Sequence, residues 1–313
     1  MKFIDPRIDF AFKKIFGSED TKDILISFLE SLLGLAEDRR IAHLTILDPF
    51  LAPRIKDLKY SVLDVRCTDH RGVSYIVEMQ VQKVDAFLKR IQYNAAKAYV
   101  HQIEKGEDYP RLNQVIAITI TDFSLFHCFA HCVSRHEARE TITGQAFLQE
   151  ILYYFIELPK FTKTLENLTG VLDQWIWFIK FAGTMEGVPD QIRTEPIRHA
   201  FEKARVANMT KEEHEYYDKA GIAIQDARGA LTVARQEGFL IGEQKGRQEG
   251  RQEGRQEGLR DGETRSLLRL VERRFQSVPE WVHSKLANAD LEAIRRWMEN
   301  ILEAKSIDDV FQP

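Results

Sequence analysis

The sequence has few cysteines and no apolar run long enough to cross a membrane. Its 313 residues contain three cysteines, at positions 67, 128 and 132, which form no paired framework. This excludes a disulfide-stabilised secreted domain and predicts a reducing compartment, with the cytoplasm as the default location. Met1–Phe12 lacks the apolar segment of a signal peptide. Because no stretch approaches the roughly 20 apolar residues of a membrane-spanning helix, we expect no membrane partner.

The sequence also lacks an excess of positive charge. Its formal net charge is −4, which excludes an overall basic field for nucleic acid, although a site can still be basic locally. No glycine-rich phosphate loop and no Ser-His-Asp arrangement stands out. What is present is ordinary for a globular protein, with 44% hydrophobic and 29% charged residues. The length is enough for one large domain with an appendage, or for two domains.

Two alternating stretches with turn residues between them predict a β-hairpin. Tyr60–Cys67 and Val73–Gln82 each alternate apolar and polar residues, and Asp69–Gly72 has the composition of a tight turn. The hairpin is the centre of the predicted fold, because the most informative polar residues of the chain lie on it.

Acidic and amide side chains converge on one face of this hairpin. Folding about the turn places Asp64 opposite Val77 or Glu78, and Glu78 shares a face with Gln80 because strand side chains alternate. Two carboxylates brought together repel each other unless a cation lies between them, and a divalent metal with oxygen ligands is the natural candidate. The alternative is an ordinary exposed hairpin face, on which acids and amides are common.

The flanking sequence predicts an α/β core around the hairpin. Helical periodicity covers Asp9–Leu35, with a division near Gly17–Asp20, and also Val84–Glu104. The nearly uniformly apolar Asn113–Thr121 predicts a strand buried on both faces. The order strand, helix, strand favours a right-handed crossover. Further strands are expected at Ile41–Phe50, Phe126–Ala138 and Gln149–Leu158, and further helices at Leu165–Ile179, Ile197–Asn208 and Lys211–Arg235.

A cluster of histidines and cysteines between residues 127 and 136 suggests a zinc site. On the strand predicted there, His127 and His131 point one way while Cys128 and Cys132 point the other. Four ligands therefore do not converge, and we interpret these residues as part of a strand.

Residues 238–262 form a repeat with glycine at every fourth position, and the unit Gly-Arg-Gln-Glu occurs three times from Gly246. On a helix, each residue type makes a ridge that drifts about 40° per four-residue step. The glycine ridge, flanked by Arg and Glu ridges, would let two helices approach and pair charges. The alternative is a solvated linker, because each interior glycine costs roughly 0.8–1 kcal/mol relative to alanine. Ser266–Phe311 then predicts a small helical bundle, with Asp290 capping its final helix.

Several motifs in order along the chain resemble a known family. They are Asp5–Gly17, Leu63–Val65, Val77–Gln80, Arg90 with Tyr93, Glu157–Phe161 and Trp175–Phe178. In this order they resemble the Rpn family of recombination-promoting nucleases, also described as transposases, within the PD-(D/E)XK nuclease superfamily. The likeness covers residues 1 to about 235.

The resemblance implies a PD-(D/E)XK core, with a mixed sheet flanked by helices, and a recombination-linked DNA endonuclease that depends on Mg²⁺ or Mn²⁺. Asp64 and Glu78 would hold the metal, and Gln80 would orient the attacking water. Asp9 is a candidate for an additional acid, although an acid at a helix start is also favoured by the helix dipole. The superfamily's usual lysine is Gln80 here, and glutamine carries no charge; Lys83 is a candidate to supply it.

Basic residues on the helix after the hairpin are candidates for binding DNA. Lys89, Arg90 and Lys97 would contact phosphates, or would form a solvated helix face. A second hypothesis is a catalytically degenerate DNA-binding or assembly protein that forms homo-oligomers through residues 238–313. The expected domains are residues 1–235, nuclease-like, with a sheet core to about 160 and a helical part over 161–235; residues 236–264, a repeat helix or linker; and residues 265–313, a small helical domain.

Overall fold

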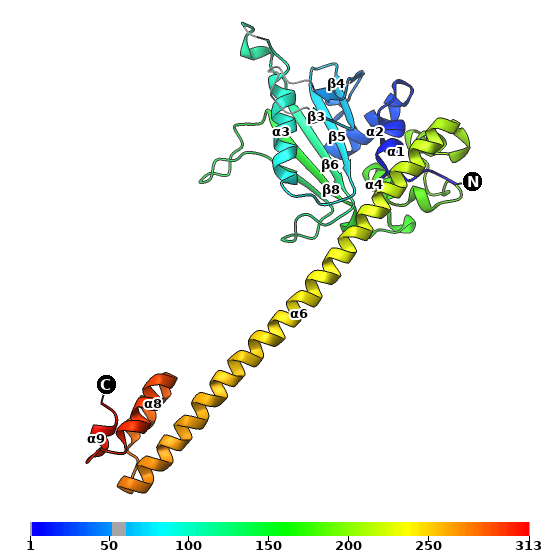
Figure 1. Cartoon of the computed structure of the whole chain (residues 1–313). Coiled ribbons are helices and arrows are strands. Elements are labelled where there is room, and N and C mark those ends of the chain that lie inside the picture. The colour runs from blue at the N-terminus through cyan, green and yellow to red at the C-terminus, as the bar shows by residue number, and fades with distance from the viewer. Residues whose placement is uncertain (1, 52–60, 105, 313) are drawn as a thin grey trace. The chain divides into compact units, whose positions relative to one another are not determined.

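The computed structural model describes residues 2–51, 61–104 and 106–312 (Figure 1). The chain separates into two units, Met1–Arg228 and Gly229–Pro313. Each unit has a buried apolar cluster of its own. Within the described residues, no helix is both long enough and apolar enough to cross a membrane.

The first unit is built on a six-stranded mixed sheet. The strands of the unit are β1 Leu44–Leu47, β2 Phe50–Leu51, β3 Ser61–Val62, β4 Val65–Asp69, β5 Ser74–Gln80, β6 Val115–Thr121, β7 Val133–His136 and β8 Ile151–Glu157. The large sheet has the order β1-β4-β5-β6-β8-β7, and β2 pairs with β3 separately. Strands β5, β6 and β8 are parallel, and the other neighbours are antiparallel. The predicted α/β class with a mixed sheet is confirmed.

Helices cover both faces of this sheet (Figure 1). They are α1 Asp9–Phe16, α2 Lys22–Leu33, α3 Phe87–Val100, α4 Val171–Phe181 and α5 Glu195–Lys203. On β6, Val115 and Ala117 join an apolar cluster with α3, while Ile116 and Ile118 join a cluster with the other four helices. All seven residues of β6 are buried, as its apolar and β-branched sequence predicts.

The turn of the hairpin is confirmed. Strands β4 and β5 pair antiparallel with Val65 beside Val77, and the turn lies at Asp69–Gly72 as predicted. Gly72 has a φ of +84°, a backbone conformation that glycine adopts without steric cost. This register fixes which β5 residues face α3, namely the even-numbered ones.

The first strand of the hairpin is interrupted, which corrects the continuous strand predicted over Tyr60–Cys67; the first residue of that range lies outside the described chain. The pairing stops at Leu63 and Asp64, between β3 and β4. The Leu63 N–H donates to a loop carbonyl, and the Asp64 carboxylate accepts the Met79 N–H. Hydrogen bonds to a side chain and to a loop carbonyl thus replace the regular backbone hydrogen bonds between strands at this point.

The segment before β7 also departs from the prediction. Instead of a strand over Phe126–Ala138, only β7 is extended, and the histidines and cysteines at 127, 128, 131 and 132 precede it. The reason is local: the Glu157 carboxylate accepts the N–H groups of Leu125 and Phe126, and Lys160 donates to the Phe126 carbonyl. Side chains therefore satisfy backbone groups that a strand would pair.

The second unit is helical. Helix α6, Lys211–Phe275, begins in the first unit and contains the glycine repeat, and it is followed by α7 Glu280–Ala287, α8 Leu291–Asn300 and α9 Ile307–Val310. Leu267 and Val271 of α6 are buried with Ile294 and Trp297 of α8 in one cluster. The Asp290 side chain accepts the Ala293 N–H at 2.7 Å, so the predicted cap of α8 is confirmed.

Candidate active site

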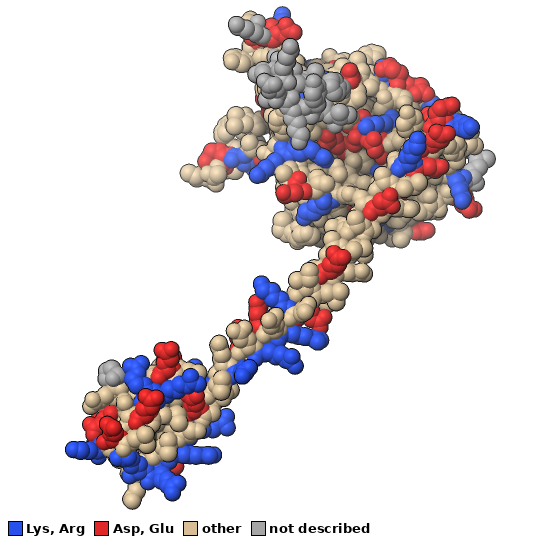
Figure 2. Space-filling view, viewed as in Figure 1, with Lys and Arg blue, Asp and Glu red and all other residues tan. Residues whose placement is uncertain are grey.

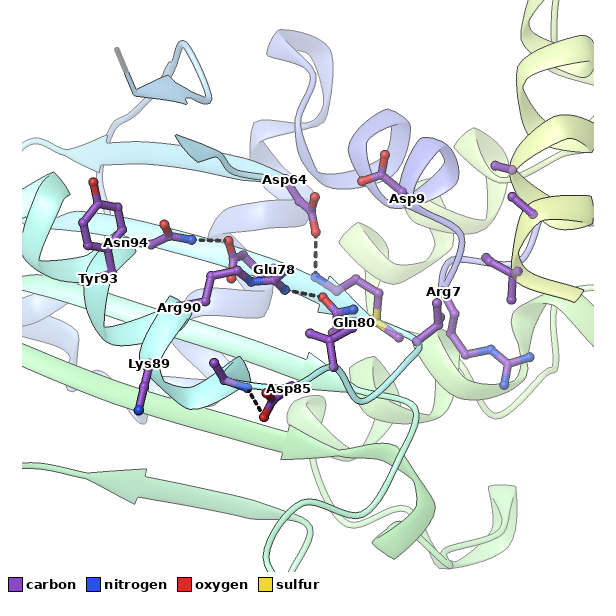
Figure 3. A pocket seen from close by; sticks show the side chains of 17 residues that line it. Arg7, Asp9, Asp64, Glu78, Gln80, Asp85, Lys89, Arg90, Tyr93 and Asn94 are labelled. Atoms are coloured by element: carbon purple, nitrogen blue, oxygen red, sulfur yellow. Dashed lines mark hydrogen bonds between the residues drawn. The ribbon is translucent and has the colours of Figure 1, made fainter. Parts of the chain in front are cut away.

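A cavity of about 1080 Å³ lies where β5 meets the start of α3 (Figure 3). Its lining also includes residues from the N-terminal segment, the Asp64 bend and α6. Of the residues predicted from sequence, six line this cavity, and Lys83 and Lys97 do not. Those lining it are Asp9, Asp64, Glu78, Gln80, Lys89 and Arg90.

Asp64 lies in the break between β3 and β4, where two contacts hold its carboxylate. Its Oδ2 accepts the Met79 N–H at 2.8 Å, and its Oδ1 lies 3.5 Å from Lys13 Nζ. Burial is the main cause that raises the pKa of Asp64 to about 7, with the neighbouring Asp9 carboxyl acting in the same direction. The Met79 N–H and Lys13 act in the opposite direction. Near neutral pH, this carboxylate is therefore costly to keep charged without a further cation.

Glu78 faces α3 from the middle of β5. Its neighbour Met79 donates its N–H to Asp64, and Asp64 and Glu78 line the same cavity. The Asn94 Nδ2 donates to Glu78 Oε1 at 3.2 Å. Burial raises the pKa of Glu78, while the charge of Arg90 and the bond from Asn94 act against that rise.

Gln80 has both ends of its amide engaged. Its Oε1 accepts from Arg90 Nη2 at 2.6 Å, and its Nε2 donates to the Gln82 carbonyl at 3.0 Å. Figure 3 shows Arg90 reaching Gln80 between the sheet and α3. To orient a water molecule, this side chain must give up one of these bonds.

The predicted basic residues do not form one surface. Lys89 and Arg90 are exposed and line the cavity. Lys97 is buried, lies two turns further along α3, and has its Nζ 5.9 Å from the centre of the Tyr93 ring. Burial lowers the pKa of Lys97. The structure thus brings two of the three predicted DNA-binding residues to the cavity and separates the third.

Further polar residues at the site were not predicted, among them Lys13, Asn94 and Arg7. Lys13 follows Asp9 by one helical turn, and Asn94 follows Arg90 by one turn, so helical spacing could have identified both. Arg7 lines the cavity and is held by Asp5 at 2.7 Å and by Asp122. No local sequence pattern indicates the long-range pair of Arg7 and Asp122. The same is true of the cavity wall from α6, formed by Ala220, Ala223 and Ile224.

The donor set suits a hard divalent cation. Asp64 and Glu78 offer carboxylate oxygens in a partly buried site, and Mg²⁺ is commonly held by one or two carboxylates with water completing its shell. Among the described residues, no group of three or more His, Cys, Asp or Glu side chains is arranged to hold a metal ion. The fit therefore rests on two carboxylates whose raised pKa values show that their charge is incompletely compensated by the protein.

Comparison with protein-family models identifies a family for this chain. A family model described as PD-(D/E)XK nuclease family transposase matches residues 6–234. No curated protein and no solved structure matches the chain. The matched range includes every residue that lines the cavity and ends before the glycine repeat.

Proposed function

The chain belongs to the PD-(D/E)XK nuclease family transposases, and on that premise we propose that it is a metal-dependent endonuclease that hydrolyses phosphodiester bonds of DNA in recombination. The observation that carries the proposal is the pair Asp64 and Glu78, two partly buried carboxylates that line one cavity and have raised pKa values. Burying a carboxylate without enough positive charge or hydrogen bonds around it costs stability, and residues with such shifted pKa values cluster at active and binding sites.

Asp64 and Glu78 would hold Mg²⁺, with Mn²⁺ as a substitute. When bound, the ion would lower the pKa of a water molecule and offset charge on the scissile phosphate. The protein's own contribution is orientation, because the Met79 N–H fixes Asp64 and Asn94 fixes Glu78. Partners of this kind hold metal-binding carboxylates in place before the metal arrives.

DNA would reach the cavity along the start of α3. Lys89 and Arg90 are exposed there, and their charges would contact phosphates on either side of the cleaved bond. Binding through phosphates weakens as salt rises because counterions are released. Lys97, which is buried, is not part of this proposed surface.

Incubation of the protein with supercoiled plasmid over a series of Mg²⁺ and Mn²⁺ concentrations tests the proposal. We expect nicked or linear DNA that appears only with one of these ions and disappears when EDTA is added. Cleavage that persists in EDTA would contradict a metal-dependent site. Intact plasmid with every divalent ion, from protein shown to be folded, would contradict the nuclease itself.

A non-cleaving DNA-binding protein is the second candidate, and the two bonds made by the Gln80 amide favour it. The wider superfamily usually has a lysine at this position, whereas the narrower family that this chain resembles also has glutamine, and here neither a charge nor a free amide is present. Retarded migration of DNA in a gel without cleavage, and without dependence on a divalent ion, is the result expected from this candidate.

We also propose that the repeat in α6 pairs with the same repeat of a second copy. Arg247, Arg251 and Arg255 follow each other at four-residue spacing, as do the glutamates at 249, 253 and 257, so neighbours along each ridge carry like charge. Figure 2 shows basic and acidic side chains along the long helix. In the described chain, Arg251 and Arg255 form no ion pair or hydrogen bond. A parallel pair would set the Arg ridge of one helix beside the Glu ridge of the other, whereas an antiparallel pair would match like charges.

Two charge-inverted variants test this pairing. One replaces the three arginines by glutamate, and the other replaces the three glutamates by arginine. We expect the wild type to sediment as a dimer, each variant alone as a monomer, and their equimolar mixture as a heterodimer. A wild type that stays monomeric at all concentrations would contradict the pairing, as would a variant that dimerises alone.

A cytoplasmic location agrees with the thiols. Cys67, Cys128 and Cys132 are all free, as is usual in a reducing compartment. We therefore propose that the protein acts on DNA in the cytoplasm.

A further inference from the structure

Four basic residues are candidates for the positive charge that Gln80 does not supply. Arg7 is committed to Asp5 and Asp122, whose bonds and charges raise its pKa. Arg90 is bonded to Gln80. Lys83, the candidate suggested by the sequence, is exposed and does not line the cavity. None of these three contacts Asp64 in the described structure.

The fourth, Lys13, does contact Asp64. Its Nζ lies 3.5 Å from Asp64 Oδ1 and 2.9 Å from Asp9 Oδ1. The Lys13 side chain is 36% exposed and that of Asp64 17%, so the contact is partly shielded from water. Coulombic attraction at this separation is several times stronger in such surroundings than in bulk solvent.

The position of Lys13 is fixed by its helix. Ala11 and Ile15, on the opposite side of α1, are fully buried, as are Phe12 and Phe16, so the helix cannot easily turn. Burial acts to lower the pKa of Lys13, but its bonds to Asp9 and Asp64 outweigh this, and the pKa is raised.

Lys13 approaches Asp64 from the side of the main cavity. It lines an adjoining cavity of about 420 Å³, and Asp9 lines both cavities. A side chain in this place can act on Asp64 without filling the space over Glu78 and α3. The start of α3 then stays available for DNA.

We propose that Lys13 is the positioning cation of this site and takes the part that the superfamily gives to a strand lysine, because its ammonium group lies 3.5 Å from Asp64 Oδ1 and 2.9 Å from Asp9 Oδ1, where it orients the Asp64 carboxylate and adds positive potential where a phosphate would bind. The inference rests on the proposed nuclease function. It differs from the role of Lys89 and Arg90, because Lys13 acts through Asp64 and lies next to the carboxylates themselves. It also explains how the site functions with Gln80, since the charge comes from α1 instead of β5.

Lys13→Met and Lys13→Arg test the inference, with Lys14→Met as the matched control. Lys14 is the next residue of the same helix, and its Nζ bonds Glu213 at 2.5 Å instead of the cavity acids. Two quantities are measured for each protein: the single-turnover rate of plasmid cleavage at saturating Mn²⁺, and the Mn²⁺ concentration that gives half of the thermal shift. The second readout needs no DNA cleavage.

We expect Lys13→Met to slow cleavage by about 10²–10³-fold, the usual effect of removing one preorganised electrostatic group. Lys13→Arg should recover most of the rate, and Lys14→Met should match the wild type. Mn²⁺ should bind Lys13→Met more tightly than the wild type, because a competing positive charge has been removed from Asp64. A structural role would instead weaken metal binding and cleavage together, and that result would overturn the inference.

The two proposals fail in different ways. A wild type that does not cleave with any ion defeats the nuclease function, and the Mn²⁺ midpoints then decide the role of Lys13, since an unchanged midpoint in Lys13→Met overturns it. A wild type that cleaves, together with a Lys13→Met variant that cleaves as fast, overturns the role of Lys13 alone.

Discussion

Asp64→Asn is expected to abolish DNA cleavage and, at the same time, to stabilise the metal-free protein near pH 8. Asparagine keeps an oxygen that can accept the Met79 N–H but removes the charge that would hold a metal. A loss of several kcal/mol of transition-state stabilisation corresponds to a rate lower by about 10³-fold or more. The folded protein gains because a partly buried charge, whose burial raises the pKa of Asp64 to about 7, is no longer present.

The stability difference should depend on pH in a defined direction. A carboxyl with a raised pKa in the folded state binds its proton more tightly there than in the unfolded chain, so the wild type loses stability as pH rises from about 4 to about 7. The advantage of Asp64→Asn should therefore be small at pH 4 and reach on the order of 1 kcal/mol or more above pH 7. Urea unfolding at a series of pH values measures it.

Asp85→Asn is the control for this variant. Asp85 is an exposed acid that lines the same cavity, and it has no place in the proposed metal site. Its replacement should leave both cleavage and the pH profile of stability close to those of the wild type. Equal loss of cleavage in both variants would indicate a general effect of cavity charge and would contradict a specific role of Asp64.

Among the variants discussed, Glu157→Gln is expected to lower the free energy of unfolding most. Glu157 is fully buried, accepts the N–H groups of Leu125 and Phe126, and pairs with Lys160 at 2.6 Å. Removing one partner of a buried ion pair leaves the other charge without compensation, which typically costs about 3–5 kcal/mol. The free energy of unfolding, from chemical denaturation at pH 7, should fall by this amount.

Acid should remove the difference between Glu157→Gln and the wild type. Burial acts to raise the pKa of Glu157, but the bonds from Lys160, Leu125 and Phe126 outweigh it, and the pKa is lowered. An acid with a lowered pKa stabilises the fold above its unfolded pKa of about 4.3 and loses that effect as pH falls through its folded value. The exposed Glu166→Gln serves as control and should change stability little at any pH; a Glu157→Gln variant as stable as this control would contradict the prediction.

Local patterns predicted the parts of the fold that depend on near neighbours. The nearly uniformly apolar sequence of β6 predicted a strand buried on both faces, and Asp69–Gly72 predicted the turn, because both features are set by residues a few positions apart. The break at Leu63–Asp64 was not predictable in this way. It depends on a hydrogen bond between Asp64 and Met79, and alternation along a single strand contains no information about such a contact.

The candidate site shows the same division. Alternation on β5 was enough to bring Glu78 and Gln80 to one face, and the turn brought Asp64 beside them. The local excess of basic residues suggested that Lys97 would join Lys89 and Arg90, but its exposure depends on what covers the far end of α3, and the structure buries it. The contact of Lys13 with Asp64 joins a helix to a bend that are far apart in sequence, and only the folded chain reveals it.

The wall that α6 adds to the cavity has a consequence for synthesis of the protein. Ala220, Ala223 and Ile224 complete a site whose acids come from α1, the Asp64 bend and β5. A ribosome delivers the chain from the N-terminus, and domains fold as their last segments emerge. Both carboxylates are therefore translated long before the cavity can close around them. If the proposed function is correct, the cutting site is therefore complete only after the α6 residues up to Ile224 have been synthesised.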